Sequence, residues 1–249
     1  MPSNRLPRRL LGLTAALLLT AACAKTPPQS AVDAARAAQL DQALAAFSRR
    51  QDKAGPLSAY AQVTLRAGGR KELFDAALLA IPPSRLLIQI LDDLGQERAR
   101  FVADGSWVLF YDAQKNRYSR LPQDAESLRK TLKLPVSVED LIARLLQQVP
   151  PGGSLGWNEV ASAAGGSYRA LRSGDRVLWA QDPPRLIAYE ALSPSGKLQY
   201  RVDYQAQEMS WSFRRPKAEL TLRFQSFERA RPVPEGRFDT EPPPDAIPE

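Results

Sequence analysis

The residue with the clearest chemical potential in this sequence is Cys23, its only cysteine. It directly follows an apolar run, Leu10–Ala22, and that run is preceded by a leader with three arginines and no acidic residue. A basic leader, a short apolar segment and small residues before a cleavage site are typical of a secretory signal, and the run is too short to span a bilayer as a helix. We therefore expect residues 1–22 to be a signal peptide and the thiol of Cys23 to begin the mature chain.

The segment Leu19-Thr20-Ala21-Ala22-Cys23 resembles the bacterial lipobox. The resemblance implies that a diacylglyceryl group is attached to the thiol and that the new amino terminus is acylated, which fixes the protein to a membrane by a lipid anchor. Ala24 stands where lipoproteins of the enteric inner membrane carry a retaining aspartate, so the resemblance favours the periplasmic face of the outer membrane. The alternative is an ordinary secreted protein with a free or buried thiol.

The composition excludes several classes of chemistry. The sequence contains no histidine, which excludes a Ser–His or Cys–His nucleophile pair and any imidazole metal ligand. It shows no glycine-rich phosphate loop and no metal-site spacing of acids, so we expect no enzyme, no metal and no cofactor beyond the covalent lipid. Catalysis by a Ser–Lys pair or by two carboxylates stays open as the alternative. The formal net charge of +7 falls to about +4 without the leader, a modest excess that gives no reason to expect a nucleic-acid partner.

The spacing of apolar residues changes along the mature chain. Residues 23–33 are proline-rich and polar and are predicted to be a lipidated tether, whereas the alanine-rich segment from there to Arg50 has helical spacing. From Leu57 onward the pattern is instead one of alternating apolar and polar residues, which is typical of half-buried strands. The alternating segments are 57–66, 74–81, 85–91, 98–103, 107–111, 116–121, 158–163, 167–171, 176–181, 187–192, 198–204, 210–214 and 219–227.

Two predicted helices interrupt these segments, the first at 124–132. The second begins after Ser137, a favourable N-cap, with Asp140 at the third helical position. Its apolar stripe runs from Val138 to Val149 and ends at a proline pair. Because such a stripe needs an apolar surface, we expect residues 124–149 to form a lid over the sheet.

Together these patterns predict a mainly β fold with a helical lid. About eleven short strands, interrupted once by helices, indicate one antiparallel sheet, and a sheet of that length is expected to curl. A helix over such an incompletely closed barrel leaves a hydrophobic cavity. We expect this domain to occupy residues 34–230 and a Pro-rich, mostly irregular tail to occupy 231–249.

Two stretches and their order resemble a known family. They are Arg85-Leu-Leu-Ile-Gln-Ile-Leu-Asp-Asp-Leu-Gly95-Gln and Leu134-Pro-Val-Ser-Val-Glu-Asp-Leu-Ile-Ala-Arg-Leu-Leu146. They are similar to the LolA/LolB superfamily of periplasmic lipoprotein carriers over roughly residues 55–230, and the lipobox favours the LolB side. The resemblance implies a curved antiparallel half-barrel whose cavity accepts lipoprotein acyl chains. It also implies a protein that takes lipoproteins from a LolA-like periplasmic carrier and inserts them into the outer membrane.

The resemblance also assigns candidate site residues. Leu94 and Gly95 match the protruding turn that is linked to membrane insertion in the LolB-like proteins; the alternative is that Leu94 folds back under the turn. The side chains expected to line the acyl cavity, each of which has ordinary core packing as its alternative, are Leu86, Ile88, Ile90, Phe101, Val108, Phe110, Leu141 and Leu145.

The sequence departs from the family pattern after the second lid helix and in the tail. Gln147–Pro151 replaces a Gly-Leu-Pro-like ending, and the tail contains Phe238 and the run Pro242–Pro244. These departures keep a second function open, namely a lipid-sensing or envelope-assembly lipoprotein of the same fold without transfer activity.

Overall fold

The computed structural model describes residues 42, 43, 45–47, 49, 50, 53, 55–124, 126, 136–149, 159–163, 167–172, 174–180, 185–229 and 232–249. The chain divides into two units, Met1–Ala31 and Val32–Glu249, and only the second contains described residues. The predicted signal peptide, Cys23 and the tether therefore lie outside the described residues, as does most of the predicted helix at 124–132. Before the first strand, the described residues from 42 to 50 are helical, as expected. Within the described part, no helix has the length and apolar character needed to cross a bilayer.

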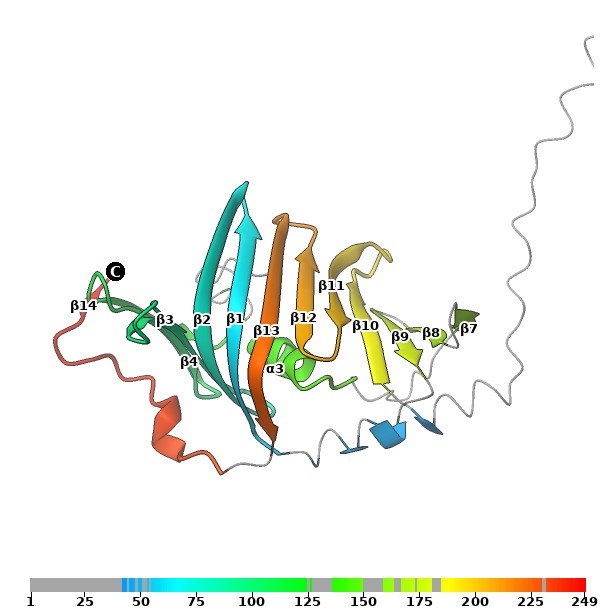
Figure 1. Cartoon of the computed structure of the whole chain (residues 1–249), viewed down its shortest axis with the longest axis horizontal. Coiled ribbons are helices and arrows are strands. Elements are labelled where there is room, and N and C mark those ends of the chain that lie inside the picture. The colour runs from blue at the N-terminus through cyan, green and yellow to red at the C-terminus, as the bar shows by residue number, and fades with distance from the viewer. Residues whose placement is uncertain are drawn as a thin grey trace, which may run out of the picture. The chain divides into compact units, whose positions relative to one another are not determined.

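The described residues form one sheet of fourteen strands (Figure 1). Its strands pair antiparallel, except that β14 pairs with β6 in parallel. The strands follow one another in the order β14-β6-β5-β4-β3-β2-β1-β13-β12-β11-β10-β9-β8-β7. Their bounds are β1 Leu57–Ala67, β2 Arg70–Ile81, β3 Arg85–Leu91, β4 Glu97–Ala103, β5 Trp107–Asp112, β6 Arg117–Pro122, β7 Glu159–Ala163, β8 Ser167–Arg172, β9 Asp175–Ala180, β10 Arg185–Leu192, β11 Leu198–Tyr204, β12 Glu208–Phe213, β13 Ala218–Arg229 and β14 Ile247–Pro248.

Each alternating segment of the sequence is a strand, and the tail adds β14, so the sheet is longer than the expected eleven strands. Along β1, buried side chains alternate with half-buried ones from Leu57 to Thr64, as the pattern predicts. The β1–β2 hairpin turns at Gly68 and Gly69, whose φ angles are 57° and 79°. A two-residue turn that matches the strand twist needs positive φ at both positions, which glycine adopts without strain.

The sheet is built from two meanders that meet at its centre. β1 pairs with β2 on one side and with β13, the last long strand, on the other. This pairing joins β1–β6 to β7–β13 in one continuous sheet.

The lid helix α3, Val138–Leu145, begins as predicted and ends earlier than predicted. The Ser137 hydroxyl accepts a hydrogen bond from the Asp140 N–H at 3.0 Å, which confirms the N-cap. The helix ends because Gln147 adopts a left-handed conformation with φ 54°, and the Gln147 N–H bonds back to the Arg144 carbonyl. Val149 is nevertheless buried, so the apolar stripe continues beyond the helix.

The main core lies between α3 and one face of the sheet, called here the inner face. It unites buried residues of both meanders with the apolar stripe of the helix, including Val138, Ile142 and Leu146. A helix that covers a sheet in this way removes the stripe and the inner face from water together, which is the main driving force for the fold.

A second, smaller core lies on the opposite, outer face. Leu87, Val102 and Leu109 of β3–β5 pack there against Phe238, which is 3% exposed. Phe238 belongs to a short 3₁₀ helix, η2 (Glu235–Phe238), and the chain then continues to β14, which pairs in parallel with β6. The tail is thus more ordered than the sequence analysis expected, because an outward-facing apolar patch on β3–β5 gives it a surface to cover.

Candidate functional site

The cavity residues predicted on the sheet share the inner face. Ile88 of β3 pairs with Phe101 of β4, which in turn pairs with Phe110 of β5. Leu86 of β3 and Val108 of β5 lie in the next row, and both pair with Ala103 of β4. Because residues directly opposite each other in a ladder project to the same side, the register brings these side chains together.

The two remaining predicted cavity residues lie on the lid helix. Leu141 and Leu145 of α3 are 5% and 3% exposed and belong to the same cluster as Leu86, Phe101 and Val108. Ile88 packs against this cluster, whereas Ile90 and Phe110 are half-buried. The structure therefore gathers six of the eight predicted residues in the core between α3 and the sheet, and Ile90 and Phe110 are not part of that core.

Alanines separate the larger side chains on this part of the inner face. Ala76 and Ala80 of β2 and Ala103 of β4 are fully buried, and Ala99 is 8% exposed. A methyl group fills little of the distance between sheet and helix, so the larger side chains beside these alanines, among them Leu86 and Phe101, fill this half of the inner face.

Leu94 occupies the tip of the β3–β4 turn and is 83% exposed. The Asp92 side chain fixes the turn, because its Oδ1 accepts hydrogen bonds from the N–H groups of Leu94 and Gln96, each at 2.9 Å. Gly95 completes it with φ 76°. The alternative in which Leu94 folds back under the turn does not occur; a rigid turn presents an uncovered leucine to the surroundings.

Neither a protein-family model nor a curated protein sequence matches this chain. Solved structures do match its fold. A DUF1329-family protein from Desulfovibrio piger aligns with a TM-score of 0.59 at 10% identity, over 81% of this chain and 96% of its own. A putative outer membrane lipoprotein-sorting protein domain from Vibrio parahaemolyticus aligns at 0.57 and 12% identity, over 79% and 94%.

A LolA-superfamily protein from Nitrosomonas europaea aligns with a TM-score of 0.54 at 12% identity, over 79% of this chain and 97% of its own. The chain has a LolA/LolB-like fold. The expected mainly β, curved half-barrel with a helical lid is thereby confirmed.

The inner face of this LolA/LolB-like half-barrel has a second part that the sequence analysis did not single out. Large aromatic side chains of β9–β12 fill it, and they are almost completely buried. Tyr200 stacks on Trp211 with ring centroids 5.7 Å apart, and Trp211 lies 5.9 Å from Phe213. The members of this aromatic cluster are Trp179, Tyr189, Tyr200, Tyr204, Trp211 and Phe213. The sequence pattern could have revealed this cluster, because every second residue of 200–204 and of 209–213 is apolar and these residues therefore share one face of the sheet.

Arg144 of α3 is a charged side chain enclosed by this aromatic cluster. It is fully buried, and its guanidinium carbon lies 3.6 Å from the centroid of the Tyr189 ring. None of its three guanidinium nitrogens has a hydrogen-bond partner among the described residues. The Tyr204 hydroxyl instead donates to the Arg144 carbonyl at 3.2 Å.

Burial dominates the ionisation of the groups around Arg144. Desolvation raises the pKa of Tyr189, Tyr200 and Tyr204 above the usual value of a phenol. Desolvation also raises the pKa of Asp140, against the opposing attraction of Arg144. The tyrosines are therefore neutral at pH 7, and they serve as packing and hydrogen-bonding groups.

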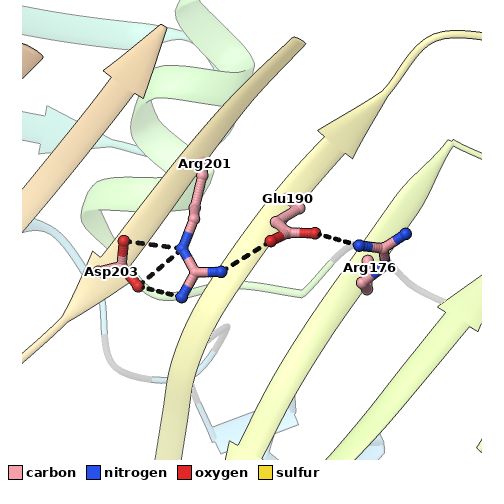
Figure 2. Close-up of polar contacts among 4 residues, drawn as sticks. All are labelled: Arg176, Glu190, Arg201 and Asp203. Atoms are coloured by element: carbon pink, nitrogen blue, oxygen red, sulfur yellow. Dashed lines mark hydrogen bonds and ion pairs between the residues drawn. The ribbon is translucent and has the colours of Figure 1, made fainter. Parts of the chain in front are cut away.

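The outer face of the same strands carries a row of alternating charges (Figure 2). Glu190 accepts hydrogen bonds from Arg176 Nη1 at 2.9 Å and from Arg201 Nη1 at 2.7 Å. Arg201 also holds Asp203, with its Nε 2.9 Å from both carboxylate oxygens. Hydrogen bonding to Asp203 raises the pKa of Arg201 above its usual range. The row is a cross-strand ladder of side chains, and within the described residues no group of three or more acids, cysteines or histidines is placed to hold a metal ion.

Proposed function

We propose that this chain is a lipid-anchored protein of the outer membrane that binds lipoprotein acyl chains beneath α3 and releases them into the bilayer. The observation that carries the proposal is the helix-covered aliphatic part of the inner face, on a fold like that of the Nitrosomonas LolA-superfamily protein and the Vibrio lipoprotein-sorting domain. The lipobox at Cys23 supports the anchor. No bond is made or broken in this mechanism, and a LolA-like periplasmic carrier is the proposed donor.

Binding beneath α3 requires the helix to yield space to the incoming chain. The alanines of β2 and β4 and the half-buried Ile88, Ile90 and Phe110 favour the β2–β5 side for that movement. Each methylene that leaves water contributes about 0.8 kcal/mol, so an acyl chain supplies enough free energy to displace short aliphatic contacts. Release then needs a destination of similar apolarity, and a bilayer provides it.

Leu94 supports a role in release. An exposed leucine on a turn fixed by Asp92 gains about 1.5–3 kcal/mol when it enters an apolar phase, at little cost in ordering because the turn is already rigid. We propose that Leu94 enters the periplasm-facing leaflet of the outer membrane while the cargo leaves the inner face of the sheet.

The test is a transfer experiment. Purified carrier loaded with a labelled lipoprotein is mixed with this protein and then with liposomes. We expect the wild type to take the label and pass it on, and Leu94→Glu to take the label but pass it at least tenfold more slowly. The control is Trp107→Glu, which places a carboxylate at a 42%-exposed aromatic residue beside the β4–β5 turn and should transfer like the wild type. Failure of the wild type to accept label would contradict the proposal.

The aromatic cluster favours a second candidate function. Because it fills the β9–β12 side of the inner face, the space for several acyl chains at once is reduced. A protein that senses or binds a single lipid without transferring lipoproteins fits that arrangement. It predicts binding of a fluorescent fatty acid together with no uptake of label from the loaded carrier.

A further inference from the structure

A hollow of about 1020 Å³ opens at the end of the sheet where the β1–β2 hairpin turns. Three segments line it: Arg66–Lys71 of the hairpin, residues of β11, and the turn that joins β12 to β13. The segments are neighbours in the sheet, because Arg66 of β1 pairs with Glu219 of β13 and Glu219 pairs with Ser212 of β12. We call this hollow the basic groove, defined by Arg66, Ala67, Gly68, Gly69, Arg70, Lys71, Leu198, Arg201, Ser212, Phe213, Arg214, Lys217, Ala218 and Glu219.

The charge of the basic groove is strongly unbalanced. Its lining contains six arginines and lysines and one acid. Arg66 is paired with Glu219 at 3.1 Å, and Arg201 is paired with Asp203 and Glu190. The side chains of the remaining four cations make no hydrogen bond or ion pair with a described residue, and they are Arg70, Lys71, Arg214 and Lys217. Four uncompensated cations around one hollow attract anions and raise their local concentration.

The tip of the hairpin leaves the groove open. A side-chain carbon added at Gly68 or Gly69 would meet no other atom within 4 Å. The tip therefore adds no bulk of its own, and an oxyanion can approach the flanking Arg70 and Lys71 from the solvent side.

Exposed apolar side chains lie at the same end of the sheet. β3 ends at Leu91, which pairs with Asp75, so the part of β2 from Arg70 to Phe74 extends beyond β3. Leu73 lies on that extension and is 58% exposed, and Leu94 follows directly after the end of β3. Lysine and arginine beside exposed leucine are typical of surfaces that rest in the headgroup region of a bilayer.

We propose that the basic groove binds the phosphate-bearing headgroups of anionic phospholipids and so orients the hairpin end of the sheet toward the membrane. This inference rests on the proposed membrane function but deepens it, since it names the lipid class and the surface. The occupant is a bilayer surface, because the exposed leucines and the cations face the same end of the sheet and a membrane offers apolar chains and phosphates side by side. A soluble phosphate would use the cations alone.

The experiment uses the chain from residue 23 onward with Cys23→Ser, so that no covalent lipid contributes to binding; the compact unit that begins at Val32 is retained whole. Its affinity is measured for vesicles of phosphatidylcholine with and without phosphatidylglycerol. No carrier and no cargo are present, so failure here is distinguishable from failure of lipoprotein transfer.

We expect the protein to bind the anionic vesicles, and Lys71→Gln/Lys217→Gln to bind them about 25-fold more weakly, because each cation near an anionic surface is worth about a factor of five. The matched control is Lys53→Gln/Arg237→Gln, which removes the same charge from two exposed residues outside the groove. The control should keep most of the wild-type affinity.

Three results would overturn the inference. One is equal loss of affinity in the groove and control variants, which would mean that only net charge matters. Another is competition by millimolar glycerol phosphate, which would identify a soluble anion as the ligand. The third is wild-type binding that does not depend on phosphatidylglycerol. Thermal unfolding of all variants checks that the fold is kept.

Discussion

The two meanders of the sheet differ on both of their faces. Inside, β2–β5 present mainly alanines and aliphatic side chains together with Phe101 and Phe110, whereas β9–β12 present the aromatic cluster. Outside, β3–β5 are covered by the tail through Phe238, whereas β9–β11 carry the charged row of Figure 2. One sheet thus combines a half dominated by large aromatic rings with a half in which alanines and aliphatic side chains predominate.

This difference indicates that the two halves of the sheet have different roles. Aromatic rings lose little rotamer freedom on burial and pack with specific geometry, so the β9–β12 half suits a permanent core. The β2–β5 half is covered by α3 on one face and by the tail on the other, and α3 is not hydrogen-bonded into the strand ladders. We therefore propose that a ligand binds on the β2–β5 half and that the aromatic half contributes most of the stability.

The largest expected effect comes from the aromatic half. Trp211→Ala should reduce the free energy of unfolding by about 3–5 kcal/mol, because Trp211 is 1% exposed and stacks on two rings. Urea unfolding measures the loss. Ile88→Ala, at a half-buried position on the other half, should cost clearly less; a larger cost for Ile88→Ala would reverse the assignment of the two halves.

The tail provides the next test. Phe238→Ala should reduce the free energy of unfolding by about 3 kcal/mol, the lower end for a buried phenylalanine, because the tail can partly detach instead of leaving a cavity. Limited proteolysis should then cleave the tail before the sheet. Unchanged stability would show that the tail does not hold the outer face of β3–β5.

Arg144 tests how the helix meets the aromatic cluster. Arg144→Met should raise the free energy of unfolding by about 1–4 kcal/mol, because it replaces a buried cation without hydrogen-bond partners among the described residues by an apolar chain of similar length. Arg144→Lys, which keeps the charge but loses the flat contact with Tyr189, should instead destabilise. A clear loss of stability in Arg144→Met would mean that attraction to the nearby Asp140 outweighs desolvation.

The smallest effect concerns pH. Burial opposes ionisation of Asp104, but hydrogen bonds from the N–H groups of Trp107 and Ser106 and from the Thr240 hydroxyl hold its pKa below the usual value. A carboxyl with a depressed folded pKa stabilises the fold above its unfolded pKa of about 4, and this contribution is lost as the pH falls through the folded pKa.

Asp104→Asn should therefore lower stability at pH 7 by about 1 kcal/mol and flatten the decline of stability below pH 4. Thermal unfolding between pH 2 and pH 7 measures both. An unchanged decline in the variant would show that the link between the β4–β5 turn and Thr240 carries no pH dependence.

Local features of the fold could be predicted from the sequence. Alternation located the strands, the Asp92–Gly95 turn followed from its turn residues, and Ser137 was recognised as a cap from its side chain and position. Each of these depends on interactions within a few residues, which the local order of side chains determines.

Long-range features could not be predicted in the same way. The pairing of β1 with β13 joins residues 151 to 172 positions apart, from Ala67 with Ala218 to Leu57 with Arg229, and alternation says which face a residue takes but not which strand lies beside it. Phe238 covers an outer patch that exists only once β3–β5 are paired. Arg144 lies on the flank of the helical stripe, and it is buried only because Tyr189 and Tyr204 come from strands that reach that flank.

The central claim is that an acyl chain binds beneath α3 on the β2–β5 half. A fatty acid with a photoactivatable diazirine at its chain end, incubated with the chain from residue 23 onward, illuminated and mapped by mass spectrometry, tests it most directly. We expect adducts in β3–β5 and α3, suppressed by excess unlabelled fatty acid. Adducts concentrated in β9–β12, or labelling that excess fatty acid does not suppress, would contradict the account.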